Sequence, residues 1–393
     1  MKKVLVLNGS FCEEPIIKKA KEMGYYVVTT GNAPELVGHQ FADEYIPCDY
    51  SDKEAILELV KRNHMEGIIS CANDFGVLTA AYVAEKMGWK GHDSYETAVL
   101  LHHKDKFKQY CKEHNIPSPI SEVFTDKESA MQYCRSAEYP IIVKANDLTG
   151  GKGINRADNL QEAEKALDIA FEMSRDKHIV VEPFIEGTQH SICVFLVNQK
   201  VMVSSSCQCY SFENPYLIQA ETFPSRDIQG ETKSNLEKII ENMAEDLQLK
   251  DGILNLQLII KDGKPYIIEM MRRCFGNDAL LPYMMVTGFD WYEAYIKAAL
   301  GENMSQAELI NPYKKYCGHY SAMAKESGCL KLCMFDEKIM RHVFKRIDMV
   351  EPGEFIDNPN AERPVYLYYE YDDINLMNEE VSHYNEWTKV ITE

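Results

Sequence analysis

Short apolar runs alternate with amphipathic segments through the first hundred residues, and this alternation constrains the fold more than any other feature. Residues 4–9 and 25–31 have the composition of buried strands, and residues 13–23 between them have the pattern of a helix. Strands and helices that alternate in this way predict βαβ units and a parallel sheet. The turn after the first strand reads Asn-Gly-Ser and lacks the G-x-G-x-x-G spacing, so we assign no dinucleotide site to it.

A later strand-like run, residues 67–74, ends in Asn73 and Asp74. Open α/β sheets bind ligands at the carboxyl ends of their strands, so these two side chains could contact a ligand. Asn and Asp are also favoured caps for the first turn of a helix. We favour the helix cap.

The pattern changes from about Lys104 onwards, where strand-like runs dominate. Residues 139–147 read as a strand before a glycine-rich turn, and residues 255–271 read as a hairpin with Asp262-Gly263 as its turn signal. After about Asn311 comes a segment of about eighty residues that is rich in Tyr, Met and Cys, with a strand-like run at 365–371. Its aromatic side chains could form a core, a dimer contact or a substrate pocket, and a core is the default interpretation.

The chain has 393 residues, a length that predicts roughly two to three domains. Its net charge of −19 argues against a nucleic-acid partner, because phosphate backbones bind basic surfaces. A local group of Lys and Arg can still bind a small anion. No apolar stretch approaches the ~20 residues that a membrane helix needs. Acidic residues follow the first apolar run at once, unlike in a signal peptide, so we expect a soluble, cytoplasmic protein.

Twelve cysteines are scattered along the chain without a C-x-x-C pair. Cys207 and Cys209 are separated by one residue, and Cys329 and Cys333 lie four positions apart. Either pair could hold a metal ion, but buried reduced thiols are the favoured interpretation. Such thiols fit a reducing cytoplasm.

Lys144 lies at the end of a strand and precedes the run Thr149-Gly150-Gly151-Lys152-Gly153. One ammonium and several backbone N–H groups placed together can surround a polyphosphate, because glycine lets the backbone approach oxygen atoms closely. The run is not a Walker A loop, which requires G-x-x-x-x-G-K-[ST] at the start of a helix. A hairpin with a permissive turn explains this segment equally well.

Gln257 and Glu269 lie twelve residues apart on the two strands of the predicted hairpin, so their side chains can converge on one face. Amide and carboxylate oxygens are ligands that Mg²⁺ accepts together with water and phosphate oxygens. Arg273 lies four residues beyond Glu269 and could reach an anionic reacting group. The alternative is a surface glutamate, although a carboxylate within an apolar run usually has a partner.

A third segment, residues 180–187, reads as a strand that runs into a connector, where Phe184 and Ile185 could hold an adenine ring by packing and backbone hydrogen bonds.

Four segments, in this order, together resemble the ATP-grasp superfamily over roughly residues 1–310: HKDKFKQYCKEHNIPSP, YPIIVKANDLTGGKGI, VVEPFIEGTQHS and GILNLQLIIKDGKPYIIEMMRR. That resemblance implies an α/β and α+β architecture. An N-terminal parallel-sheet domain (1–103) would precede an ATP-grasp domain of two α+β subdomains (104–310), with a mobile lid at about 118–185 and a small C-terminal extension (311–393).

The resemblance also implies roles for individual residues. The two nucleotide lysines match Lys104 and Lys144, although Lys106 lies close enough to Lys104 to confuse the assignment. The other nucleotide-binding positions, in the loop over the phosphates, the adenine connector and the ribose site, match Thr149, Gly150, Gly151, Gly153, Glu182, Phe184, Ile185 and Gln189. The two magnesium ligands match Gln257 and Glu269. Arg273 matches the arginine that steadies the acyl phosphate, and the lysines neutralise charge on the group that is transferred.

Three positions depart from the usual pattern of the superfamily. That pattern reads E-x-N-x-R after the second metal carboxylate, whereas this chain has Met271 at the Asn position; some members, including carboxylases of purine synthesis, also lack this Asn. Gln257 stands where many members have Glu, although carbamoyl-phosphate synthases also use Gln there. Gln189 falls where relatives often have a ribose-binding Glu. These changes remove negative charge from the site, which should weaken Mg²⁺ binding.

The resemblance implies a ligase that uses ATP and Mg²⁺ to activate a small-molecule carboxylate as an acyl phosphate and to join it to an amine. Such chemistry needs no protein nucleophile, and the chain has no convincing Ser-His-Asp or Cys-His signature.

Two alternatives to this function stay open. Carbamoyl-phosphate-synthase-like chemistry on bicarbonate or carbamate is favoured by Gln257, and a nucleotide-binding module without catalysis is favoured by Met271 and Gln189. A homodimer is compatible with the aromatic C-terminal segment.

Overall fold

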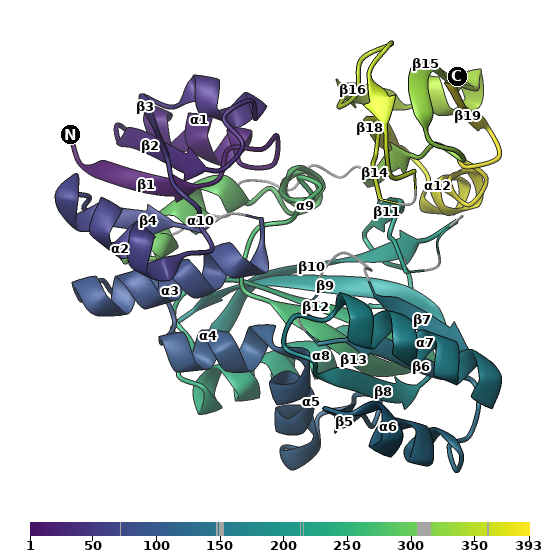
Figure 1. Cartoon of the computed structure of the whole chain (residues 1–393). Helices are drawn as coiled ribbons and strands as arrows, with labels where there is room; N and C mark the ends of the chain where they lie inside the picture. Colours follow the sequence, from purple (N-terminus) through teal and green to yellow (C-terminus); the bar gives the residue numbers. More distant parts are fainter. Residues whose placement is uncertain are drawn as a thin grey trace.

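The computed structural model describes residues 1–70, 72–146, 148, 153–212, 214, 216–304, 316–359 and 361–393. Within these residues the strands form four sheets (Figure 1). No helix in the described ranges is long and apolar enough to cross a membrane.

The N-terminal part contains the expected parallel sheet. Its strand order is β3-β2-β1-β4 and every pairing is parallel, with β1 (Lys3–Leu7), β2 (Tyr26–Gly31), β3 (Glu44–Pro47) and β4 (Gly67–Ile69). The connections contain α1 (Glu14–Glu22), η1 (Val37–Phe41) and α2 (Lys53–Arg62), and α3 (Asp74–Met87) follows β4. The predicted βαβ organisation is therefore confirmed.

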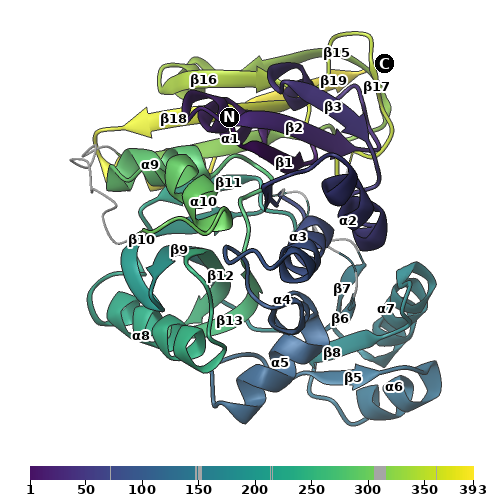
Figure 2. The ribbon, with the colours of Figure 1, turned by 90° about the vertical axis from the view of Figure 1, so that its left-hand side faces the viewer.

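The helix α10 (Trp291–Ala299) joins the N-terminal sheet to the rest of the molecule. Its fully buried Trp291 shares one core with Val4 of β1 and Phe195 of the central sheet. Figure 2 shows α10, together with α9 (Leu280–Thr287), between the N-terminal sheet and the central strands. A Cβ atom at Gly91 would lie 2.1 Å from the carbonyl oxygen of Ala299, so the approach of this loop to α10 requires glycine.

A smaller antiparallel sheet forms a separate unit, drawn at the lower right of Figure 1. Its order is β5-β8-β6-β7, with β5 (Glu122–Phe124), β8 (Ile179–Pro183), β6 (Ile141–Ala145) and β7 (Ile154–Ala157). The helices α6 (Lys127–Cys134) and α7 (Leu160–Met173) contribute to a core of its own, which includes Val143, Leu167 and Val181. The sheet lies within residues 118–185, the range expected for the lid, and we call its four strands the lid sheet after that expectation.

The central sheet is antiparallel throughout and runs in the order β13-β12-β9-β10-β11-β14-β18-β16. Its first five strands are β13 (Lys264–Met271), β12 (Gly252–Lys261), β9 (Thr188–Val197), β10 (Lys200–Tyr210) and β11 (Ala220–Phe223). Side chains of β9 alternate between two cores. Val194 faces the core shared with α5 (Lys104–Glu113) and α8 (Gly230–Asp246), whereas Phe195 faces the core shared with α10. The helix α4 (Tyr95–His102) precedes α5.

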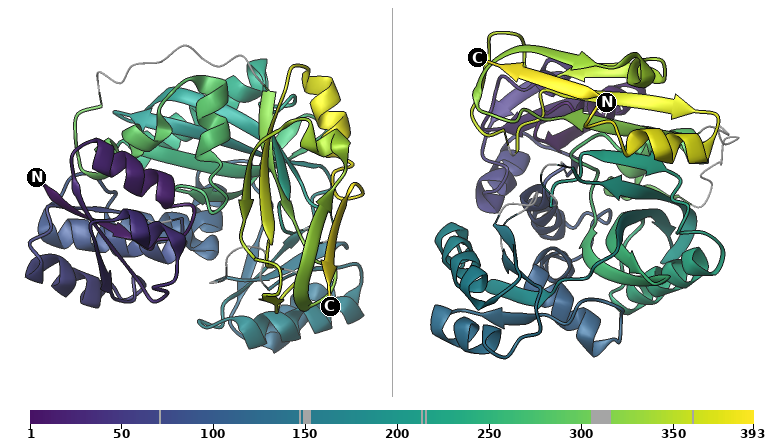
Figure 3. Two further views of the ribbon diagram at one scale, coloured as in Figure 1. Left: turned by 90° about the horizontal axis from the view of Figure 1, so that it is seen from above. Right: turned by 90° about the vertical axis from the view of Figure 1, so that its right-hand side faces the viewer.

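Residues 316–393 extend this central sheet, an arrangement that the sequence did not predict (Figure 3). The strands β14 (Tyr316–Ala322), β18 (Val365–Tyr371) and β16 (Val343–Asp348) continue it, while β15 (Gly328–Phe335), β17 (Phe355–Ile356) and β19 (Thr388–Thr392) form the fourth sheet. The helices here are α11 (Glu337–Met340) and α12 (Ile374–Val381).

The predicted strand at 365–371 is β18, and its tyrosines are buried in two different cores. Tyr369 and Tyr371 pack within the C-terminal part, whereas Tyr366 and Tyr368 pack against Phe11 of the N-terminal part. These four aromatic side chains therefore belong to hydrophobic cores, which was the default interpretation of the aromatic residues in this segment.

Phe195→Ala should lower the free energy of unfolding by about 3–5 kcal/mol, because the ring is fully buried and its removal leaves a cavity. Urea denaturation followed by tryptophan fluorescence measures the change. Phe355→Ala is the matched control, because that ring is 60% exposed and its loss should change stability by no more than about 0.5 kcal/mol. Equal effects of the two substitutions would contradict the assignment of Phe195 to a shared core.

Candidate active site

Gln257 and Glu269 are direct partners across the β12–β13 hairpin. The hairpin turn is Asp262-Gly263, whose φ angles are 50° and 73°, as a two-residue hairpin turn of this kind requires. A register shift between Gln257 and Leu258 then brings Glu269, rather than Ile268, opposite Gln257. Directly paired residues point to the same face of a sheet, so the amide and the carboxylate lie side by side. The side chain of Glu269 is 30% exposed, which leaves it open to a ligand.

Lys104 is the first residue of α5, and its ammonium lies 3.9 Å from the Glu269 carboxylate. The same ammonium donates to the carbonyl oxygen of Leu148, at 2.5 Å, in the segment after β6. Lys106 is exposed on the surface of α5. Of the two lysines that the sequence could not separate, Lys104 is the one that reaches the hairpin.

Asn255 is a residue of this region that sequence analysis missed. It lies two positions before Gln257 on β12, which places both side chains on one face, and it pairs with Met271 of β13. Its side chain is 99% buried, and among the described residues neither atom of its carboxamide has a hydrogen-bond partner. A buried polar group without a partner indicates a water, an ion or a ligand at that position.

Lys144 lies on β6, and its ammonium donates to Glu182 of β8 at 2.6 Å. The other carboxylate oxygen of Glu182 accepts from Ser121, at 2.7 Å, and lies 3.5 Å from the ammonium of Lys108. All three charged groups are buried. Burial alone would raise the pKa of Glu182, but the charges of Lys108 and Lys144 outweigh it and lower that pKa to about 2. Glu182 is therefore ionised and holds both lysines in place.

Sequence analysis missed Lys108, although a signal was present. Lys104 and Lys108 are four residues apart on α5, so they occupy one face of the helix. Lys108 also donates to Ser118, at 2.8 Å, and to the carbonyl oxygen of Ile267 on β13, at 3.3 Å. Burial lowers the pKa of Lys108 to about 8, against the opposing attraction of Glu182.

Arg273 is held by the N-terminal part of the chain. Its Nε donates to Asp74 at 2.5 Å, and the same carboxylate oxygen accepts from His102 at 3.2 Å. Burial would raise the pKa of Asp74, but the charge of Arg273 and the contact with His102 hold it well below its usual range. Asn73 caps α3 by accepting from the Phe75 N–H, so the predicted helix cap is present and the neighbouring Asp74 orients the arginine.

Two more buried carboxylate side chains, Glu13 and Asp278, contact segments that are distant in the sequence. Sequence analysis singled out neither of them. Glu13 accepts from the backbone N–H groups of Ser10 and Ala72, each at 2.8 Å, and so joins the loops after β1 and β4. Asp278 accepts from the Tyr292 hydroxyl at 2.5 Å and from the Lys345 ammonium at 3.3 Å. Burial raises the pKa of Asp278 to about 6.

The structure describes part of the nucleotide-binding positions implied by the resemblance. Thr149, Gly150 and Gly151 lie outside the described residues. Gly153 has a φ of +69°, where a Cβ atom would lie 3.0 Å from the Leu148 side chain, so this position favours glycine.

The connector positions are placed beside the lid sheet. The N–H of Phe184 donates to the carbonyl oxygen of Pro140 at 3.0 Å, and the Arg156 guanidinium lies 4.4 Å from the Phe184 ring centroid. Ile185 follows as a half-buried residue, and Gln189 is half-buried on β9.

Parts of the chain are similar in sequence to known proteins. Residues 102–213 match the family described as phosphoribosylglycinamide synthetase, ATP-grasp (A) domain. The carbamoyl phosphate synthase large chain of Clostridium acetobutylicum is 24% identical over 294 residues, which cover 73% of this chain. The chain spans 27% of the length of that relative.

Two solved structures share the fold over nearly the whole chain. The L-amino acid ligase from Bacillus licheniformis has a TM-score of 0.82 at 18% identity and covers 100% of this chain and 99% of its own. The biotin carboxylase domain of the Hydrogenobacter thermophilus 2-oxoglutarate carboxylase, in complex with MgADP, ADP and bicarbonate, has a TM-score of 0.78 at 19% identity, with 99% and 90% covered.

The fold is the one found in ATP-grasp proteins, so the resemblance found in the sequence and the α/β and α+β fold class are confirmed. More particularly, residues 102–213 are similar to the ATP-grasp (A) domain of phosphoribosylglycinamide synthetase. The assignments of individual site residues and the domain boundaries stay predictions.

Glu182→Gln should lower the free energy of unfolding by about 3–5 kcal/mol at pH 7, because it leaves two buried ammonium groups without a carboxylate. The pKa of Glu182 is lowered to about 2 in the folded chain, so its contribution is complete above its ordinary pKa of about 4.3. It is lost as the pH falls from there through about 2. The difference between wild type and variant should therefore shrink below about pH 5.

Chemical denaturation between pH 7 and pH 3 measures this dependence. Glu186→Gln, at an exposed position four residues further on, is the matched control and should change stability by no more than about 0.5 kcal/mol. A pH-independent difference between wild type and Glu182→Gln would show that the carboxylate does not stabilise the fold through its charge.

Proposed function

We propose that this chain is an ATP-dependent ligase that activates a carboxylate as an acyl phosphate and joins it to an amine, with release of ADP and phosphate. The observation that carries the proposal is the convergence of the Lys104 ammonium on Glu269, itself paired with Gln257, within an ATP-grasp fold. The cofactors are ATP and Mg²⁺, and the substrates are small molecules.

The donor set of the hairpin fits a magnesium ion. Gln257 and Glu269 offer an amide oxygen and a carboxylate oxygen on one face, and hard oxygen ligands of this kind are what Mg²⁺ accepts. Asn255 offers a third oxygen on that face, with no hydrogen-bond partner among the described residues. These three residues would hold the ion, which would neutralise charge on the phosphates.

Lys104 and Lys144 bring positive charge to the phosphate chain from two sides. Lys104 comes from α5 and Lys144 from the lid sheet, so a nucleotide between the hairpin and the lid would meet both ammonium groups. The Glu182 carboxylate keeps the Lys144 side chain in position beforehand. Preorganised charge of this kind stabilises a phosphoryl group in transfer without reorganisation during the reaction.

Arg273 would steady the acyl phosphate. Asp74 and the carbonyl oxygen of Cys274 accept from its guanidinium, so its orientation is fixed before substrate binds. The γ-phosphoryl group passes from ATP to a carboxylate oxygen. The amine nitrogen then attacks the carbonyl carbon, phosphate leaves as the C–N bond forms, and the proton that the nitrogen loses passes to solvent. Each step balances without a covalent bond to the protein.

The remaining nucleotide contacts are assigned by the resemblance. Thr149, Gly150, Gly151 and Gly153 would cover the phosphates. The Phe184 and Ile185 backbone would contact adenine, where the Phe184 carbonyl oxygen is the group to test because its N–H is bonded to Pro140. Gln189 would bond the ribose as a neutral group.

A homodimer and a cytoplasmic location belong to the same proposal. The cysteines among the described residues are free thiols, which supports a reducing compartment.

The alternatives are less well supported. Carbamoyl-phosphate-synthase-like chemistry is supported by Gln257 and by the relative from Clostridium acetobutylicum, but the chain spans 27% of that relative. A module without catalysis was suggested by Met271, which offers no hard oxygen. Asn255 lies directly opposite Met271 and offers the oxygen that Met271 lacks.

Glu269→Ala should reduce turnover by at least about 100-fold, because it removes the one carboxylate that would hold the metal ion near the phosphates. Gln257→Glu should lower the Mg²⁺ concentration needed for half-maximal rate, because it adds a charge to the ion's ligands. ADP release over a panel of carboxylates and amines measures both. Glu326→Ala, at an exposed position on the C-terminal part, is the control; normal metal-dependent turnover in Glu269→Ala would overturn the assignment of the hairpin.

Asn255→Leu separates a ligand role from a structural one. Leucine has the same number and branching of side-chain heavy atoms and no polar atoms, so relieving a buried unpartnered amide should leave stability unchanged or raise it. If Asn255 contributes an oxygen to the ion, the Mg²⁺ concentration for half-maximal rate should rise about tenfold. Thermal unfolding and a Mg²⁺ titration of the same variant give the two readouts, and an unchanged Mg²⁺ requirement would exclude the ligand role.

A further inference from the structure

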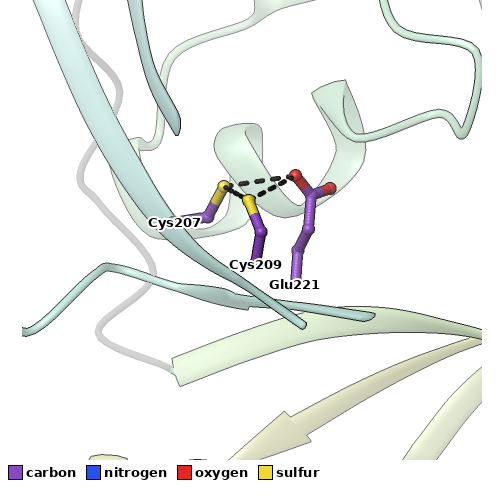
Figure 4. Close-up of side chains that lie close together, drawn as sticks. All are labelled: Cys207, Cys209 and Glu221. Carbon is purple, nitrogen blue, oxygen red and sulfur yellow. Dashed lines mark hydrogen bonds between the residues drawn. The ribbon is translucent and has the colours of Figure 1, made fainter. Parts of the chain in front are cut away.

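A second group of ligand-type side chains lies on three neighbouring strands of the central sheet, apart from the hairpin. Cys207 and Cys209 are two positions apart on β10, so both point to the same face. Cys209 pairs directly with Glu221 of β11, and Glu221 pairs directly with His319 of β14. The register therefore brings two thiols, a carboxylate and an imidazole together, and Figure 4 shows the sulfur atoms directed toward Glu221.

The distances between these atoms fit one tetrahedral ion. With Zn–S of about 2.3 Å and Zn–O of about 2.0 Å, tetrahedral geometry places two sulfurs about 3.8 Å apart and each sulfur about 3.5 Å from the oxygen. The sulfurs of Cys207 and Cys209 are 3.9 Å apart. They lie 3.3 and 3.7 Å from Oε1 of Glu221.

The other carboxylate oxygen of Glu221 is held by the surrounding protein. His319 donates to Oε2 at 2.5 Å, and the Asn277 amide donates to the same atom at 3.0 Å. Oε1 therefore faces the two sulfurs, while the contacts from His319 and Asn277 hold Oε2 in place. Hydrogen bonds of this kind orient the ligands of protein metal sites and tune their affinity.

Burial and ligand type limit what this group can bind. Cys207, Cys209, Glu221 and His319 are all at most 6% exposed. Among the described residues, Cys207, Cys209 and Glu221 are the one set of three such ligands whose atoms lie close enough for a shared ion. Two thiolates select a thiophilic cation over the Mg²⁺ that the oxygen ligands of the hairpin favour.

We propose that Cys207, Cys209 and Glu221 form a zinc-binding site, with His319 as the residue that positions Glu221. Three protein ligands leave the fourth coordination position for water or another small ligand, an arrangement found in zinc sites that act on substrates. Without the ion, the thiol of Cys207 donates to Glu221, so the polar atoms remain paired. Binding of zinc replaces that hydrogen bond and releases the two thiol protons.

The test uses the full chain, reduced, freed of metal with a chelator and kept in excess Mg²⁺ so that the hairpin is occupied. Titration with Zn²⁺, and in parallel with Co²⁺, is followed by metal analysis and by the absorption band of cobalt–thiolate bonds. We expect one equivalent per chain and a thiolate band in the wild type. Cys207→Ser and Cys209→Ser should bind at least tenfold more weakly and lose that band.

Cys134→Ser is the matched control, because Cys134 is equally buried in the core of the lid sheet; it should keep full binding. Glu221→Gln retains the shape of the side chain and one of its two acceptor oxygens but not its charge, and should weaken zinc binding without unfolding the chain. Absence of a thiolate band in the wild type would overturn the proposal whatever the variants do. Equal zinc uptake by wild type, Cys207→Ser and Cys209→Ser would overturn it as well, and buried reduced thiols would then be the correct interpretation.

Discussion

The register of the central sheet is the constraint on which the placement of functional side chains depends. A slip of one residue in any pairing would turn every side chain of that strand to the other face. In the observed register, one row of directly paired residues crosses four strands through Glu269, Gln257, Ser191 and Cys207. A second row of paired residues crosses four strands through Gln189, Cys209, Glu221 and His319. Polar groups from residues 189 to 319 are therefore gathered on one face, opposite the core that Val194 and α8 share.

Buried charge pairs join the parts of the chain where they meet at this face. Glu182 of the lid sheet contacts Lys108 of α5, and Arg273, just beyond β13, contacts Asp74 of the N-terminal part. A buried ion without its partner costs several kcal/mol, so these pairs favour one relative placement of the parts over others. The same pairs orient the side chains that the proposed chemistry needs, so that structure and catalysis depend on common contacts.

Local sequence patterns predicted those site residues whose positions depend on nearby residues in the chain. They did not predict residues or strand pairings that depend on contacts between distant segments. The hairpin that carries Gln257 and Glu269 followed from the Asp262-Gly263 turn signal. Their direct pairing also depends on a register shift between Gln257 and Leu258 that the turn does not encode. Lys108, Glu13 and Asn255 were missed because their importance lies in burial and in partners from other elements. The addition of β14 and β18 to the central sheet was also missed, since β14 pairs with β11 about a hundred positions earlier in the chain and no local pattern encodes such a pairing.

The way the central sheet is assembled also affects how the chain acquires its structure during synthesis. The lid sheet is built from residues 122–183, so its contacts close short loops and can form early. The pairing of β11 with β14, and of β14 with β18, brings together segments far apart in sequence, and closing such loops costs entropy before any contact forms. Until residues beyond 365 have left the ribosome, β14 has an unpaired edge, and unpaired edges promote association between chains. The nascent protein therefore depends on β18 to pair the exposed edge of β14 in its largest sheet.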